Sequence, residues 1–126
     1  MLQAARQLVE QTLHCAAQDT GGGRRPDREQ QLAFLVGLPG VWILAATLYH
    51  YLGSLAERNR YISKYAELSP YFTQEIIFPQ GSDELFIGRA GYLCGLYELR
   101  QITGEQIACK EVLFRQPDCH PSTLPV

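Results

Sequence analysis

Two segments of the chain repeat each other, and this internal repeat constrains the fold more than any other feature of the sequence. An offset of 51 residues places GLPGVWILAATL, residues 37–48, over GRAGYLCGLYEL, residues 88–99. The offset pairs identical residues at three positions: Gly37 with Gly88, Gly40 with Gly91, and Leu48 with Leu99. Two glycines three residues apart permit a tight turn and a close backbone approach. GxxG is a weak motif by itself, but the helical apolar spacing after both copies predicts two similar units, each a turn followed by a helix.

Amphipathic helices are expected to alternate with these apolar ones. The apolar helices are predicted over 41–52 and 90–102, and amphipathic helices over 1–17 and 105–115. Ser54 and Glu57 form a capping-box pattern that predicts the start of another amphipathic helix, which Pro70 should end. Alternation of this kind is typical of two concentric helical layers built from repeats. The sequence therefore predicts an all-α fold.

A membrane-spanning segment has to be weighed against this fold. Residues 32–52 contain no Asp, Glu, Lys or Arg, and as a helix they would cover roughly 30 Å of hydrocarbon. Gly37, Pro39 and Gly40 interrupt the run near its start, and what remains continuous is short for a span. A helix that is apolar on nearly all sides also fits the inner layer of a helical protein. We favour the inner-layer interpretation.

Composition limits the chain to one modest domain and disfavours nucleic acid as a partner. The 126 residues are 46% hydrophobic and carry a net charge of -2, so no broad positive field is available to hold a phosphate backbone. The domain is expected over 1–115, with a flexible loop at 18–29 that is rich in glycine and arginine. Residues 116–126 are expected to be a divergent, disordered tail.

The residues that could carry chemistry form no recognisable catalytic or metal-binding motif. The four cysteines have no CxxC spacing, and with no secretory signal apparent they are expected to be reduced and cytosolic. Cys94 and Cys109 fall in apolar helical stretches, which predicts small buried hydrophobic residues. His14 and His50 lack an evident second triad member. We therefore assign no catalytic, cofactor-binding or metal-binding residue, and Cys119 beside His120 cannot close a tetrahedral site alone.

Residues 81–99, GSDELFIGRAGYLCGLYEL, and residues 33–53, AFLVGLPGVWILAATLYHYLG, resemble the LanC-like family, the eukaryotic relatives of bacterial lanthionine cyclases. GSDELF and GRAGYLC are most similar to one paralogous branch of that family. The resemblance implies a toroid of inner and outer helices, an (α/α) barrel with seven GxxG-bearing repeats, of which this chain holds about two. The glycine turns would lie at one end of the inner barrel, facing its central cavity.

The resemblance also implies zinc-dependent, glutathione-linked thioether chemistry in full-length relatives. Their zinc is held by two cysteines and a histidine from WCHG-like and CHG-like motifs, and neither motif is present here. We therefore expect a truncated or partial LanC-like protein that holds no zinc, is not catalytic by itself, and binds glutathione only by analogy. Its place would be cytoplasmic, or peripheral to the plasma membrane.

About two of seven barrel repeats would leave the helices at both flanks without neighbours. We therefore expect the isolated chain to be marginally stable or to self-associate through its exposed inner helices. The alternative function is a membrane-associated or partner-binding helical module that uses those helices and the loop arginines, Arg24, Arg25 and Arg28. Within this alternative, membrane association is possible but is not favoured.

Arg89 is the one charged residue inside the family motif, which otherwise comprises Gly37, Gly40, Gly88 and Gly91. A cation at a helix N-terminus opposes the helix dipole and should have a compensating partner. Asp83 or Glu84 can supply one. The sharper alternative is that Arg89 binds an anion, since a helix N-terminus itself attracts anions.

Overall fold

The computed structural model describes residues 1–19, 31–73 and 83–104, and the secondary structure in these ranges is helical. The helices are α1 (Leu2–Asp19), α3 (Leu38–Tyr51), α4 (Leu55–Ala66), α5 (Ser69–Phe72) and α6 (Arg89–Thr103). The all-α prediction is confirmed. Because α1 continues through Gln18 and Asp19, the predicted loop begins later than expected. The rest of that loop, the predicted helix 105–115 and the tail 116–126 lie outside the described residues.

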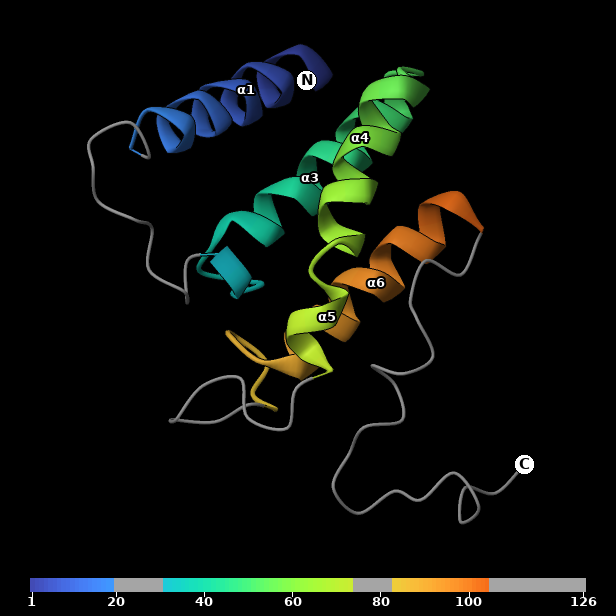
Figure 1. Ribbon diagram of the computed structural model, residues 1–126. Helices are drawn as coiled ribbons and strands as arrows, with labels where there is room; N and C mark the ends of the chain where they lie inside the picture. The colour runs from blue at the N-terminus through green and yellow to red at the C-terminus, as the bar shows by residue number, and fades with distance from the viewer. Residues whose placement is uncertain (20–30, 74–82, 105–126) are drawn as a thin grey trace.

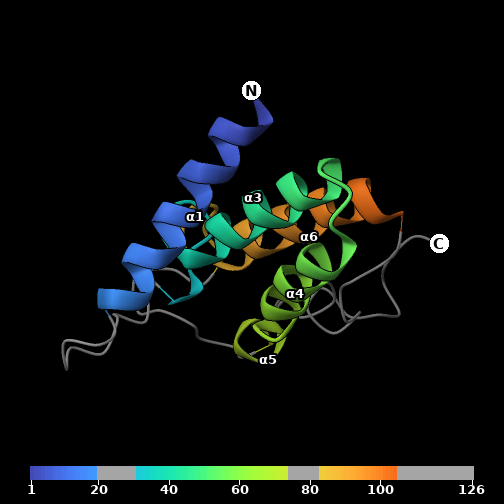
Figure 2. The same ribbon diagram turned by 90° about the horizontal axis from the view of Figure 1, so that it is seen from above.

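The helices form two layers, as expected for part of an (α/α) barrel. The inner helices α3 and α6 lie side by side and run in the same direction (Figures 1 and 2). Helices α1 and α4 run in the opposite direction and pack on α3 from different sides (Figure 2). Helix α3 thus contacts the three other long helices, which is the position expected for the most apolar segment of the chain.

Helix α3 begins within the glycine-proline segment that was expected to interrupt it. Gly37 is its N-cap, and Pro39 lies in the first turn, where the missing N–H of proline costs nothing. The helix ends at Tyr51, and Gly53 then adopts a left-handed φ of 78° that lets the chain reverse into α4. At 14 residues α3 is short, and no helix in the described part of the chain is long and apolar enough to span a membrane.

Helix α4 begins where the sequence predicts, but neither of its predicted boundary devices operates. Ser54 is the N-cap without a side-chain capping bond, so the capping-box prediction is wrong. Glu57 turns instead to Arg60, one turn further along the helix, at 3.6 Å. The helix ends at Ala66, before Pro70, which lies in the first turn of α5. Pro70 therefore starts a short helix and does not end the long one.

The core lies mainly between α3, α4, α5 and α6, and five of its twelve members are aromatic. Its members are Leu32, Ile43, Ala45, Ala46, Tyr49, Tyr61, Tyr65, Leu68, Phe72, Tyr92, Leu96 and Leu99. Helix α1 contributes little to this core, because Val9 and Leu13 pack only partly against it while Leu2 and Leu8 are exposed. Helix α6 ends at Thr103, one residue after its predicted end, and Gly104 with a φ of 72° is its C-cap, a conformation that suits glycine.

Candidate functional site

The two GxxG motifs occupy the same structural setting, at the entry to the two inner helices. Gly37 and Gly88 are the N-caps of α3 and α6, both with extended backbone. Gly40 and Gly91 lie in the first turn of those helices. At each of these two positions, a Cβ atom would overlap a backbone carbonyl oxygen six residues earlier: that of Phe34 for Gly40, and that of Leu85 for Gly91.

The loops that carry these carbonyls also contact each other. The backbone N–H of Leu35 donates to the carbonyl oxygen of Phe86 at 3.2 Å, and these two residues are themselves related by the offset of 51. The Cβ of Phe34 lies 2.9 Å from where a Cβ on Gly91 would be. Gly40 and Gly91 therefore allow each loop to fold back on its own helix. Gly91 also leaves room for Phe34 of the neighbouring loop.

Arg89 is buried and directed at protein groups of its own surroundings. Its side chain is 4% exposed, its Nε donates to the carbonyl oxygen of Phe72 at 2.9 Å, and its Nη1 pairs with the carboxylate of Asp83. Asp83 thus supplies the partner that a cation at the start of α6 requires. This pairing holds the loop before α6 against the end of α5. It favours a structural role for Arg89 over the anion-binding alternative.

A cluster of three stacked aromatic rings secures α6 to α4 and α5. The ring of Tyr92 stacks with Tyr65 at 4.9 Å and with Phe72 at 4.2 Å between centroids. The Tyr65 hydroxyl donates to the carbonyl oxygen of Tyr92 at 2.9 Å, and the Tyr92 hydroxyl donates to that of Tyr65 at 3.2 Å. Gly95 makes room, since a Cβ there would overlap the Tyr65 hydroxyl. Burial raises the pKa of Tyr65 well above its ordinary range, so the phenol stays neutral.

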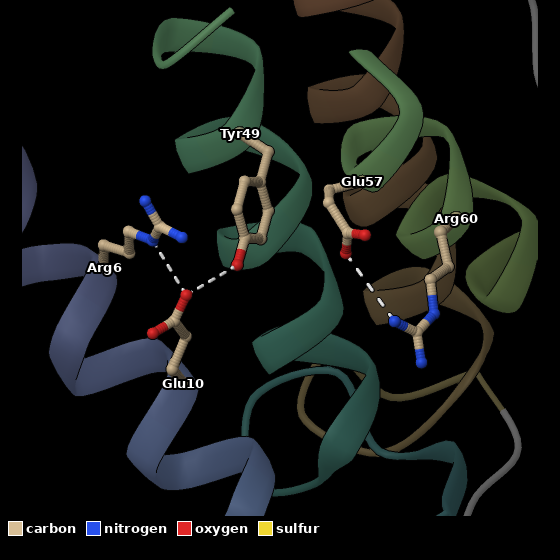
Figure 3. Close-up of polar contacts among 5 residues, drawn as sticks. All are labelled: Arg6, Glu10, Tyr49, Glu57 and Arg60. Atoms are coloured by element: carbon tan, nitrogen blue, oxygen red, sulfur yellow. Dashed lines mark hydrogen bonds and ion pairs between the residues drawn. The ribbon is translucent and has the colours of Figure 1, made fainter. Parts of the chain in front are cut away.

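A smaller polar contact joins α1 to α3 (Figure 3). The Glu10 carboxylate lies 2.8 Å from the Nε of Arg6 and accepts the hydroxyl of Tyr49 at 3.0 Å. The hydrogen bond from Arg6, then that from Tyr49, lowers the pKa of Glu10. Burial, then the bond to Glu10, raises the pKa of Tyr49. These shifts keep a charged carboxylate beside a neutral phenol at neutral pH, an arrangement suited to attaching a helix and not to proton transfer.

The thiols and imidazoles do not converge on a site. Cys15 and Cys94 are both exposed, so the prediction that Cys94 is buried is wrong. His14 pairs with Gln18 on α1, and His50 with the guanidinium of Arg58. Within the described ranges, no group of three or more His, Cys, Asp or Glu residues could hold a metal ion. Cys109, Cys119 and His120 lie outside those ranges.

The sequence predicts the glycine positions and the partner of Arg89, but it does not predict the cluster of Tyr65, Phe72 and Tyr92, which we call the tyrosine cluster. A partial signal was present: Tyr65, a member of the cluster, shares a face of α4 with Tyr61, four residues earlier, which marks that face as a buried one. Gly95 also interrupts an otherwise strong helical stretch, which suggests that a bulky neighbour needs the space.

The match to known families covers nearly the whole chain. The family model described as lanthionine synthetase C-like protein matches residues 1–115. No solved structure matches the chain.

Proposed function

Since the chain belongs to the lanthionine synthetase C-like family, we propose that it is a scaffold segment of that family: about two helical units of a partial (α/α) barrel, without catalysis of its own. The observation that carries this proposal is the duplicated entry to α3 and α6. In both, a GxxG glycine accommodates the carbonyl of residue 34 or 85. The groups at this end of the molecule serve packing.

The donor set that the family chemistry requires is not assembled by the described residues. In that chemistry a zinc ion held by two cysteines and a histidine would lower the pKa of a bound thiol, so that the thiolate adds to a dehydrated residue. Cys94 lies on α6, while Cys15 and His14 lie on α1, and within the described ranges no group of three or more His, Cys, Asp or Glu residues could hold a metal ion. The described residues therefore do not fit the metal, and we derive no catalytic step through it.

The test is a thiol-addition assay on the full chain. Purified protein is mixed with glutathione and a peptide that contains dehydroalanine, with and without added zinc, and the adduct is quantified by mass spectrometry. We expect adduct formation at the rate of the protein-free mixture. A zinc-dependent rate above that background would overturn the proposal. An active full-length family member serves as the positive control.

A partner-binding module is the second candidate function, and exposed apolar side chains favour it. Leu8 on α1 is 65% exposed and Val36 in the first loop is 63% exposed, more than a side chain with a purely internal packing role requires. Carbonate extraction of membranes, followed by gradient fractionation of the soluble material, separates the possibilities. Co-migration with one defined protein would support a module, and retention by the carbonate-washed membranes would support membrane association.

The proposal extends to the paralogue, the cellular compartment and the partners of the chain. We place the chain with the third LanC-like paralogue on the similarity of GSDELF and GRAGYLC. We place it in the cytoplasm, or peripheral to the plasma membrane, with self-association through its open flanks and glutathione as a partner by family analogy only. Fractionation tests the compartment, and calorimetric titration with glutathione tests the partner.

A further inference from the structure

The contact between the two GxxG loops joins two different edges of similar units. We name residues 2–51 unit 1 and residues 55–103 unit 2. Unit 1 contributes the side chain of Phe34 and the N–H of Leu35, whereas unit 2 contributes the carbonyl oxygen of Phe86 and the bare face of Gly91. Each unit has both edges, because the offset of 51 carries one set onto the other. The chain therefore makes this interface once and carries the two halves of a second one.

The halves of the second interface are exposed. The donating edge of unit 2 consists of Leu85, which is 46% exposed, and Phe86, which is 52% exposed. The N–H of Phe86 faces the carboxylate of Glu84 at 3.3 Å, an exposed contact within its own loop. A better-aligned acceptor could replace that long contact, since hydrogen bonds weaken as the donor-acceptor distance lengthens.

The accepting edge of unit 1 consists of Gly40 and the carbonyl of Leu35. Gly91 is buried under Phe34, but Gly40 is only half-buried. Among the described residues, its Cβ position has no neighbour within 4 Å from any loop except its own. The place that Phe34 takes on Gly91 is thus open on Gly40.

We propose that the donating edge of one copy docks on the accepting edge of a second copy, so that the chain associates head to tail. Leu85 then covers Gly40 of the second copy as Phe34 covers Gly91, and the Phe86 N–H donates to the Leu35 carbonyl. A second copy is the occupant because the chain itself supplies both halves of an interface that it already forms. The inference rests on the proposed function, since it takes the chain to be two units of a repeat. Such a heterologous contact leaves free edges at both ends until the rotation between copies closes a ring, so the assembly grows with concentration.

The first test is sedimentation velocity on the full chain with reductant, over a wide range of concentration. The apparent mass should rise from that of one 14.2 kDa chain towards two or more. Leu85→Asp should raise the dissociation constant at least about tenfold, because it removes about half of the burial energy of a leucine and adds a charge to the interface. Leu2→Asp is the matched control: Leu2 is also 46% exposed but lies on α1, away from both loops, and its substitution should leave the mass profile unchanged.

The second test identifies the contact directly. Photoreactive benzoylphenylalanine in place of Leu85, in a mixture of isotopically heavy and light chains, should cross-link to residues 34–40 of another copy. A monomer at every concentration overturns the inference, as does a cross-link to residues 105–126 of the same chain or a symmetric link between two Leu85 positions. The thiol-addition assay is independent of these readouts. Catalysis with head-to-tail association would refute only the scaffold function, and an inactive monomer would refute only the docking.

Discussion

Replacement of Gly95 by alanine sets helix propensity against side-chain packing. Gly95 lies in the middle of α6, where alanine is favoured over glycine by about 0.8–1.0 kcal/mol. The new Cβ, however, would overlap the hydroxyl and Cζ of Tyr65 and lie 3.2 Å from its Cε1. Propensity alone therefore predicts a more stable protein, and packing predicts a less stable one.

The contacts of Tyr65 decide which effect is larger. To admit the methyl group, the buried ring must leave its stacked position on Tyr92 and give up the 2.9 Å hydrogen bond to the Tyr92 carbonyl. The hydrogen bond contributes about 1 kcal/mol, the stacking about 0.5–1.5 kcal/mol, and overpacking costs about 1–3 kcal/mol. After the propensity gain is subtracted from the sum of these costs, Gly95→Ala should destabilise the fold by about 1.5–4.5 kcal/mol.

Urea unfolding followed by circular dichroism at 222 nm, at a concentration below any self-association, measures this difference. The control is the same substitution in a Tyr65→Leu background. Leucine lacks the Oη, Cζ and Cε1 atoms that crowd Gly95, so alanine should there stabilise the helix by up to about 1 kcal/mol. The sign of the alanine effect should thus reverse between the two backgrounds. A Gly95→Ala protein as stable as the parent, or an effect of the same sign in both backgrounds, would refute the packing argument.

Three further outcomes are expected. Valine at both Gly88 and Gly91 should lower solubility and helical content, because a Cβ at position 91 overlaps the loop before α6; an unchanged circular dichroism spectrum and solubility would contradict this. Tag-free protein should hold no stoichiometric zinc at neutral pH, and about one tightly bound zinc per chain in metal analysis would disprove it. Hydrogen bonds from Arg6 and Tyr49 lower the pKa of Glu10 in the folded state. The charged carboxylate therefore stabilises the fold above the ordinary carboxyl pKa, and this stabilisation is lost as the pH falls through the lowered pKa. Thermal unfolding of the parent and of Glu10→Gln should therefore differ at neutral pH and converge in acid; a gap that persists in acid would contradict that role.

Periodicity and glycine placement predicted most of the fold because they reflect local constraints. The four long helices begin and end within a few residues of the expected positions, and Asp83 pairs with Arg89 for the electrostatic reason given from the sequence alone. The interaction of a charged side chain with a helix dipole can be predicted without the tertiary structure. Such local effects can be derived from residues that are neighbours in the chain.

The failed predictions depend on contacts between distant residues. Cys94 lies in an apolar stretch, but Cys94 and Tyr97 on α6 are both exposed, so the described residues do not cover this stretch on every side. Ser54 and Glu57 have capping-box spacing, but the Ser54 N–H already donates to the carbonyl oxygen of Tyr49 at 2.9 Å, and Glu57 pairs with Arg60. The tyrosine cluster pairs residues 27 positions apart. Hydrophobic periodicity along one segment does not predict such pairings.

The two glycines of each motif meet different requirements, which the sequence pattern alone does not separate. Gly37 and Gly88 have φ values of -134° and -104°, ordinary extended angles that any residue can adopt. Their backbone conformation does not require glycine. Gly40 and Gly91, by contrast, touch a carbonyl of the preceding loop where any Cβ would overlap it. The steric constraint therefore falls on the second glycine of each motif, and at Gly91 the loop of the other unit contacts the same face through Phe34.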